Sequence, residues 1–159
     1  MEYMLKGEEK LIIEPMTEAD LDWVAKLEEE TFSLPWSREA FLEEIELPDR
    51  LFVVAKLWEQ QSDLPAMVGY SGMFLSFDEG EITNVAIAPK FRQRGLGYKM
   101  LQGQLQMARE KGAKAFTLEV RVSNSGAIHL YEKLGFESVG IRKNFYQRPT
   151  EDAMIMWKR

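Results

Sequence analysis

The sequence predicts one α/β domain in which helices flank a mixed sheet. Its 159 residues suit a single domain, here expected over 1–159, and can bury a core without a disulfide or a metal. Two observations indicate the fold class. Helix patterns come first, strand patterns follow, and from residue 89 onward helices and strands alternate. In addition, a glycine-rich turn joins a strand to a helix near the middle of the chain.

The N-terminal part carries two helix patterns. Thr17 and Asp20 resemble a capping box, and apolar residues then recur at helical spacing. A second, short helix is expected after Ser37, whose hydroxyl suits an N-cap. Between them lies an apolar loop, residues 32–36. The expected inner faces consist of Leu21, Val24 and Leu27 in the first helix and Phe41, Leu42 and Ile45 in the second.

The middle of the chain has the composition of strands. Leu51–Leu57 and Ala66–Leu75 are candidates, and a turn at Asp78–Gly80 is expected to lead into Glu81–Ile87. Ala88-Pro89 should end that strand, because proline has no amide proton to donate to a neighbouring strand.

The rest of the chain alternates between helix and strand. A helix is expected from the turn at 91–97 to Gly112, followed by a strand over Thr117–Arg121. The next helix should begin within Ser123-Asn124-Ser125 and end at Gly135. Residues 136–146 and 153–158 are expected to form a closing strand pair.

Composition excludes several kinds of chemistry. The chain has no cysteine, so it has no disulfide, thiolate zinc site or cysteine nucleophile. His129 is the one histidine, which makes a histidine-rich metal site or a Ser-His-Asp triad a poor interpretation, and we expect it to face solvent. The sequence shows no apolar run long enough for a bilayer and no signal-peptide pattern. We therefore expect a cytoplasmic protein with no metal and no membrane partner.

The net charge of −6 is unevenly distributed. Residues 1–88 carry a net charge of −14, whereas residues 89–159 carry +8. The acidic total argues against a general nucleic-acid binder. By itself the division fits ordinary solvated helix faces as well as two binding surfaces of opposite charge.

The glycine-rich turn is the first motif with a chemical meaning. The amides of such a turn and the N-terminus of the next helix attract a phosphate, and glycine lets the backbone approach it. No Gly-Lys-Ser/Thr follows, so this is not a P-loop, and Met100 stands where a dinucleotide fingerprint needs a third glycine. An ordinary tight helix start is the alternative. Arg92 and Arg94 on the same turn favour a pyrophosphate ligand.

The pattern Arg92-x-x-Gly95-x-Gly97 after Val85–Ile87 resembles the GNAT family of acyl-CoA N-acyltransferases. The resemblance implies a mixed, mostly antiparallel sheet and acetyl-CoA as co-substrate. It implies that the turn's amides hold the CoA pyrophosphate, while Val85, Ala86 and Ile87 pair with the pantetheine arm and the acetyl carbonyl. The residues that it places around the diphosphate are Gln93, Arg94, Gly95, Leu96, Gly97 and Tyr98, and Arg92 is a further cofactor-binding candidate because of its charge.

Further stretches are similar to one branch, the ribosomal-protein-alanine N-acetyltransferases, over roughly residues 10–158. The stretches are Pro35-Trp36-Ser37, Leu118–Asn124, Ala127–Phe136, Asn144–Tyr146 and Glu151–Met156. The resemblance implies that Glu119 is the proton acceptor, that Tyr131 is the proton donor and that Asn124 contacts acetyl-CoA. The sequence departs from the branch at Tyr98, where a basic residue is frequent, and at Phe145, where tyrosine is common.

The chemistry of these residue types can be judged separately. Without cysteine, direct attack of an amine on the thioester in a ternary complex is favoured. An α-amine titrates near ~7.7–8 and lysine near ~10.4, so deprotonating lysine costs about 3.5 kcal/mol more. A carboxylate is therefore an adequate base for an N-terminus. Glu119 could instead be a surface strand residue, with Glu81 as a reserve base, and Tyr131 could be a core aromatic.

The charge distribution suggests an acceptor. The resemblance implies that the first helix–helix loop and the last strand–strand loop border the acceptor channel, as in other GNAT folds. Pro35, Trp36 and Tyr146 are therefore candidates for contacting the substrate. We expect an acetyl-accepting basic N-terminal tail of a ribosomal protein, steered by the acidic N-terminal part. The alternatives are a GNAT enzyme for other protein N-termini or a small-molecule amine, and an acyl-CoA-binding module without catalysis.

Overall fold

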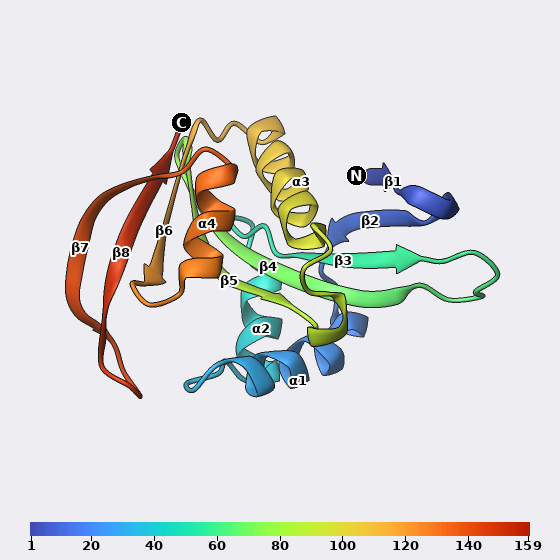
Figure 1. Ribbon diagram of the computed structural model, residues 1–159, viewed down its shortest axis with the longest axis horizontal. Helices are drawn as coiled ribbons and strands as arrows, with labels where there is room; N and C mark the ends of the chain where they lie inside the picture. Colours follow the sequence, from blue (N-terminus) through green and yellow to red (C-terminus); the bar gives the residue numbers. More distant parts are fainter.

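The computed structural model describes all 159 residues and contains one eight-stranded sheet with helices on both faces (Figure 1). Neighbouring strands are antiparallel except for one parallel pair, β5 and β6. The predicted mixed, mostly antiparallel α/β fold is thereby confirmed. In sheet order, the strands are β1 (Glu2–Met4), β2 (Lys10–Pro15), β3 (Val53–Trp58), β4 (Ala66–Ser76), β5 (Glu79–Ile87), β6 (Ala115–Arg121), β8 (Glu151–Lys158) and β7 (Glu137–Tyr146).

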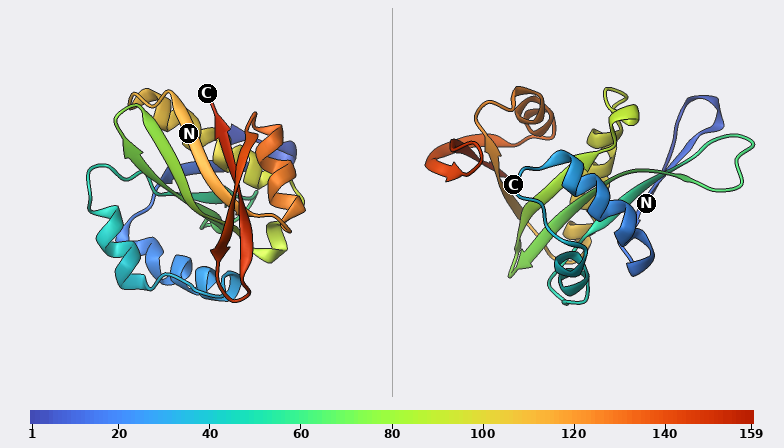
Figure 2. Two further views of the ribbon diagram at one scale, coloured as in Figure 1. Left: turned by 90° about the vertical axis from the view of Figure 1, so that its left-hand side faces the viewer. Right: turned by 90° about the horizontal axis from the view of Figure 1, so that it is seen from below.

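The helices divide between the two faces of the sheet (Figure 2). The α-helices are α1 (Leu21–Thr31), α2 (Arg38–Ile45), α3 (Leu96–Glu110) and α4 (Ser125–Lys133), and three short 3-10 helices are η1 (Lys6–Glu8), η2 (Glu18–Asp20) and η3 (Pro89–Phe91). A core of 23 buried residues lies beneath α3 and α4, and a smaller core of nine lies beneath α1 and α2. The sheet thus separates two apolar layers.

The expected helix boundaries are confirmed by their caps. The backbone N–H of Thr17 donates to the Asp20 carboxylate at 2.9 Å, and the Ser37 hydroxyl accepts from the Ala40 N–H at 3.1 Å. Gly135 follows α4 with φ of 98°, the left-handed conformation that commonly ends a helix. These are local interactions, which is why sequence spacing predicts them.

Two features differ from the expectation. The N-terminal strands β1 and β2 were not predicted, although Leu11 and Ile13 of β2 are fully buried. The turn after β4 lies at Phe77-Asp78, and Gly80 already belongs to β5. A Cβ at Gly80 would lie 2.7 Å from the Met73 sulfur, so this glycine permits close packing instead of forming the predicted turn.

The parallel pair β5 and β6 is short. Only Glu79, Gly80 and Glu81 pair with β6, where they face Ala115–Thr117. Beyond Glu81 the two strands separate, and β5 continues with β4 as its one neighbour (Figure 1). The edge of β5 from Ile82 to Ile87 is therefore free on the β6 side, in the middle of the sheet.

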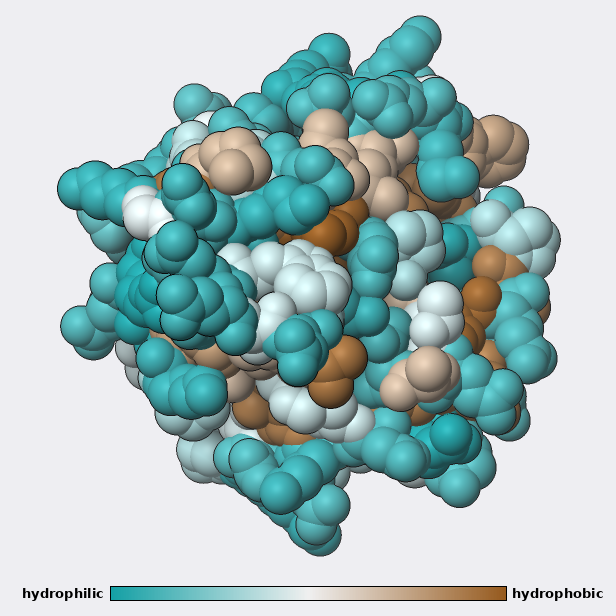
Figure 3. Space-filling model, turned by 90° about the vertical axis from the view of Figure 1, so that its right-hand side faces the viewer, coloured by the Kyte–Doolittle hydropathy of each residue, from teal (hydrophilic) through white to brown (hydrophobic).

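The end of the molecule that carries the N-terminal hairpin and the β3–β4 loop is mostly hydrophilic. Figure 3 shows this end, where apolar side chains are scattered between polar ones. Exposed apolar residues such as Met4 and Leu64 belong to the N-terminal hairpin and the β3–β4 loop. None of the helices has the length and apolar character that crossing a membrane requires.

Candidate functional site

The turn before α3 presents unpaired backbone N–H groups. Gln93 and Gly95 have φ of 63° and 75°, and a Cβ at Gly95 would meet nothing within 4 Å. Glycine is thus favoured at position 95 by its backbone conformation, not by lack of space. The N–H groups of residues 93–98 donate to no other group of the protein. Together with the positive end of the helix dipole, they form a site that fits a pyrophosphate.

The two arginines of this turn already have partners. Arg92 donates through Nε to the carbonyl of Ile87 at 2.9 Å, which ties the turn to the end of β5. Arg94 pairs with the Glu9 carboxylate at 3.3 Å. Gln93 and Gly95 are exposed, whereas Tyr98 is half-buried. The predicted diphosphate residues therefore lie on one turn, where the six backbone N–H groups are free, each arginine has one contact within the protein, and the Leu96 side chain is buried.

Helix α3 is tied to the sheet by a buried polar residue. Gln104 is fully buried; its amide donates to the carbonyls of Leu51 and Ser71 at 3.0 and 3.2 Å. Its carbonyl accepts from the Ser71 hydroxyl at 2.6 Å. These bonds fix the helix on the strands, and with it the orientation of the N–H groups at its first turn.

The end of β5 provides the second part of the cofactor surface. Val85, Ala86 and Ile87 pair with Ser71, Tyr70 and Gly69 of β4 and have no partner on the other side. An extended ligand with amide groups can pair with such a free strand edge. This observation fits the pantetheine arm of acetyl-CoA, which carries amides.

Asn124 and Tyr131 lie on α4. The Asn124 side-chain oxygen caps the helix by accepting from the Ala127 N–H at 3.2 Å, which leaves its amide nitrogen as a donor. Tyr131 is 7% exposed, and its ring packs edge-on against Phe136 at 5.9 Å. Burial and then the neighbouring Tyr146 raise the pKa of Tyr131, so its hydroxyl keeps its proton. The Tyr131 ring thus belongs to the core, and its hydroxyl donates to no protein atom.

Glu119 and Glu81 face each other where β5 and β6 separate. Leu118 and Val120 are buried on the α3 side of β6, so Glu119 points to the opposite face. Its side chain is 21% exposed, and one oxygen lies 3.5 Å from Nη1 of Arg142. Burial, and then the charge of Glu119, raise the pKa of Glu81, whereas Arg142 lowers it. The two carboxylates and one guanidinium thus form an electrostatically coupled group.

Tyr146, at the end of β7, borders the same group. Burial and the charge of Glu119 raise the pKa of Tyr146 to about 12, opposed by Arg121. The Arg121 guanidinium lies 4.6 Å from the centre of the Tyr146 ring. It therefore supports one face of that ring.

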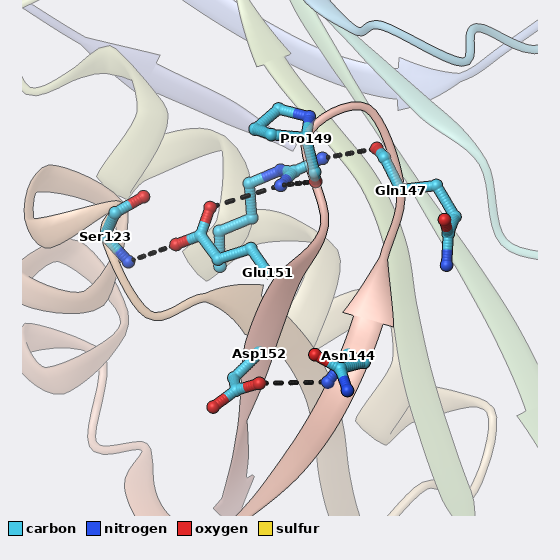
Figure 4. Close-up of polar contacts among 7 residues, drawn as sticks. Ser123, Asn144, Gln147, Pro149, Glu151 and Asp152 are labelled. Carbon is cyan, nitrogen blue, oxygen red and sulfur yellow. Dashed lines mark hydrogen bonds and ion pairs between the residues drawn. The ribbon is translucent and has the colours of Figure 1, made fainter.

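Arg121 also holds the β7–β8 turn in place through its contacts with Gln147, Pro149 and Glu151, three residues that Figure 4 labels. It donates to the carbonyls of Gln147 and Pro149, each at 2.9 Å, and pairs with Glu151 at 3.1 Å. Glu151 in turn accepts from the backbone N–H of Ser123 at 2.7 Å, just before Asn124. These contacts lower the pKa of Glu151, led by the bonds to Ser123. The turn that carries Tyr146 is thus joined to the start of α4.

The loop between α1 and α2 lies beside the β7–β8 turn in both views (Figures 1 and 2). Pro35 is exposed, and Trp36 is half-buried against the rings of Phe41 and Phe52 at 5.3 and 5.9 Å. The predicted acceptor residues Pro35, Trp36 and Tyr146 therefore come from two segments that are far apart in sequence and adjacent in space.

Several residues of the site were not predicted. Arg142, Arg121 and Glu151 reach it through contacts between strands that no short motif encodes. Glu28 is different, because an acidic residue next to Leu27 on the apolar stripe of a helix is a visible signal. His129 is exposed, as predicted.

The comparisons with known proteins agree with this geometry. Residues 21–136 match the model of the Acetyltransferase (GNAT) family. This chain belongs to the GNAT family. It is accordingly an N-acetyltransferase of the acyl-CoA-dependent class, with acetyl-CoA as co-substrate.

Three relatives illustrate how far the similarity extends. A protein of Bacillus subtilis (strain 168), provisionally named a ribosomal protein bS18-alanine N-acetyltransferase, is 38% identical over 93% of this chain and 95% of its own. The crystal structure of the ribosomal-protein-S18-alanine N-acetyltransferase from Escherichia coli is also similar, with a TM-score of 0.79 and 29% sequence identity. The match covers 93% of this chain and 92% of that chain. The structure of a spermidine/spermine N-acetyltransferase from Vibrio cholerae has a TM-score of 0.75 and 19% sequence identity. The match covers 92% of this chain and 93% of that chain. The fold alone therefore does not determine the acceptor.

Proposed function

We propose that this GNAT enzyme acetylates the N-terminal α-amine of a small-subunit ribosomal protein that begins with alanine. The observation that carries the proposal is the similarity along almost the whole chain to relatives named for this activity, at 38% identity in Bacillus subtilis. The chain would act as one catalytic domain over residues 1–159, in the cytoplasm, without a metal and without direct contact with nucleic acid or membrane.

The reaction is a direct transfer. The neutral α-amine attacks the carbonyl carbon of the thioester, a C–N bond forms, and the C–S bond breaks as the electron pair leaves with sulfur. The proton lost by the amine goes to the Glu119 carboxylate, either directly or through a water. Glu119 is suited to this role because it is partly exposed on the face where the acceptor segments lie.

Tyr131 acts on the leaving group. Because burial raises the pKa of Tyr131, the hydroxyl is protonated at neutral pH and is available as a donor. It donates a hydrogen bond to sulfur as negative charge develops there, which lowers the energy of the transition state. Because its pKa is raised, the Tyr131 hydroxyl donates this hydrogen bond more readily than it gives up its proton completely. Solvent is then a second source of the proton that the thiolate takes up.

The acceptor is held between the two segments beside the site. Pro35, Trp36 and Tyr146 contact its first residues, and the acidic N-terminal part attracts a basic tail. Exposed carboxylates on α1, on α2 and directly after α2 supply that charge: Asp22, Glu29, Glu30, Glu39, Glu43 and Glu46. Long-range attraction of this kind weakens as salt screens it.

A substrate panel tests the proposal. The enzyme is incubated with acetyl-CoA and equal amounts of an alanine-starting basic peptide, the same peptide with a blocked N-terminus, and spermidine. We expect acetylation of the free peptide alone, and a peptide KM that rises with salt. Modification of the blocked peptide or a preference for spermidine would refute the proposed acceptor, and a salt-independent KM would refute the electrostatic attraction.

One alternative acceptor class follows from the fold. The similarity to the Vibrio cholerae spermidine/spermine enzyme shows that polyamine acetylation occurs on this fold. The spermidine arm of the panel separates the two functions, because a polyamine enzyme would need no peptide bond in its substrate.

A further inference from the structure

A buried carboxylate with no part in the proposed chemistry lies beneath the α1–α2 loop. Glu28 on α1 is 2% exposed and forms no ion pair. Its oxygens accept hydrogen bonds from three neutral groups: the Trp36 N–H at 3.0 Å, the Tyr70 hydroxyl at 2.6 Å and the Asn84 amide at 3.2 Å. Burying a charge is costly unless hydrogen bonds compensate for the lost water, and these three donors do so.

The three donors belong to three separate elements. Tyr70 lies on β4, Asn84 lies on β5, and Trp36 lies in the loop. Asn84 directly precedes Val85, the first strand residue on the free edge proposed for acetyl-CoA. The Glu28 carboxylate therefore connects the acceptor loop to the strand that borders the cofactor surface.

After Phe32, whose N–H donates to the backbone carbonyl of Glu28 at 3.0 Å where α1 ends, the loop has no other polar attachment. Residues 33–36 form no hydrogen bond apart from the one between the Trp36 N–H and Glu28, and the next attachment is the Ser37 cap of α2. Otherwise the loop is held by the packing of the Trp36 ring. The bond to Glu28 thus fixes the height of the Trp36 peptide above the sheet.

We propose that Glu28 is a positioning residue for the acceptor, acting through the Trp36 peptide. The inference rests on the proposed function, in which Pro35 and Trp36 hold the first residues of the substrate. If the Glu28 bond is lost, the loop can move away from β5 and the acceptor amine loses its alignment with the thioester. Binding of acetyl-CoA to the turn before α3 does not depend on this loop.

A carboxylate suits this role because each of its oxygens is an acceptor. Glutamine has one acceptor oxygen and one amide donor, so it conflicts with one of the surrounding donors. The Tyr70 hydroxyl can turn to accept, and the Asn84 amide can rotate, whereas the Trp36 N–H can only donate. A glutamine at position 28 can therefore keep the loop attached, while an alanine cannot.

Four variants test the proposal: Glu28→Ala, Glu28→Gln, Tyr70→Phe and, as a control, Glu110→Ala, which removes an exposed helix glutamate at the end of α3. Peptide KM, acetyl-CoA KM, kcat and hydrogen exchange of the Trp36 amide are measured. We expect Glu28→Ala to raise peptide KM about tenfold, equivalent to about 1.4 kcal/mol, with acetyl-CoA KM unchanged and faster Trp36 exchange. Glu28→Gln should recover most of this loss, and Tyr70→Phe and Glu110→Ala should leave peptide KM near that of the wild type.

Each of the other outcomes overturns the inference. It is wrong if Glu28→Ala keeps the wild-type peptide KM, or if both KM values rise together as a general structural defect would make them. If Glu28→Ala does not fold, the peptide KM of Glu28→Gln is compared with that of Trp36→Ala. The inference is wrong if Glu28→Gln has a peptide KM as high as that of Trp36→Ala. A wild-type enzyme that does not acetylate the peptide refutes the proposed function instead. In that case hydrogen exchange of the Trp36 amide still tests whether Glu28 holds the loop, because this measurement needs no enzymatic activity. If exchange is the same in the wild type, Glu28→Gln and Glu28→Ala, the attachment is refuted.

Discussion

The cofactor side and the acceptor side of the site are built from different parts of the chain. The cofactor side consists mainly of backbone: the N–H groups of residues 93–98 and the free edge of β5. The acceptor side consists of segments held by side chains, with Glu28 under one loop and Arg121 with Glu151 under the other. On this assignment, which we propose, a ligand common to the family is bound by groups that most residues possess, while acceptor selection depends on a few distant contacts.

The largest effect should come from the group between the two sides. We expect Glu119→Gln to lower kcat about 10²-fold or more, since the amine loses its proton acceptor. The acetyl-CoA affinity should not change, because Glu119 lies away from the diphosphate turn. Steady-state kinetics and acetyl-CoA titration measure both, and Glu79→Gln is the matched control, an exposed glutamate on β5. Near-native kcat in Glu119→Gln would move the base role to Glu81.

The cofactor side can be perturbed by one methyl group. Gly95 and Gly126 both have open space for a Cβ, but only Gly95 has a positive φ, 75°. We expect Gly95→Ala to raise acetyl-CoA KM several-fold, about 1 kcal/mol, because the turn must shift, and to leave peptide KM unchanged. Gly126→Ala should change neither constant. A rise in peptide KM alone would contradict the division between the two sides.

A smaller effect is expected for Glu81. Its raised pKa means that folding favours its neutral form, so ionisation of Glu81 destabilises the protein as pH rises through the ordinary range of a carboxyl group and above it. Glu81→Gln should therefore raise Tm at pH 7 and leave it unchanged at acid pH, where Glu81 is protonated in both states. Thermal unfolding at the two pH values measures this. An equal gain in Tm at both pH values would show that ionisation of Glu81, which burial and then the charge of Glu119 oppose, is not the cause.

The same contrast explains what the sequence could predict. The turn at 92–97, the caps at Ser37 and Asn124 and the proline after β5 all involve residues within a few positions of each other. The ion pair of Glu119 with Arg142 joins residues 23 apart in sequence, and that of Arg121 with Glu151 joins residues 30 apart, so spacing does not reveal either. Glu28 was detectable as an acidic residue on an apolar helix face, but its partners were not.

The fold showed a similar limit. Strand β2 was missed because its three adjacent apolar residues, Leu11–Ile13, give no alternating pattern, and its identity depends on pairing with β3. Gly80 was taken as a turn residue because glycine most often indicates one, whereas here it makes room for Met73 and Phe116. Long-range packing determines both features.

The central claim is that this enzyme acetylates an α-amine and not a side-chain amine. The most direct test uses one basic peptide that begins with alanine and contains a lysine at the third position, so that both amines compete within one molecule. Fragment mass spectrometry of the product locates the acetyl group. The account predicts acetylation at the α-amine alone, and acetyl groups on the lysine at a comparable level would contradict it.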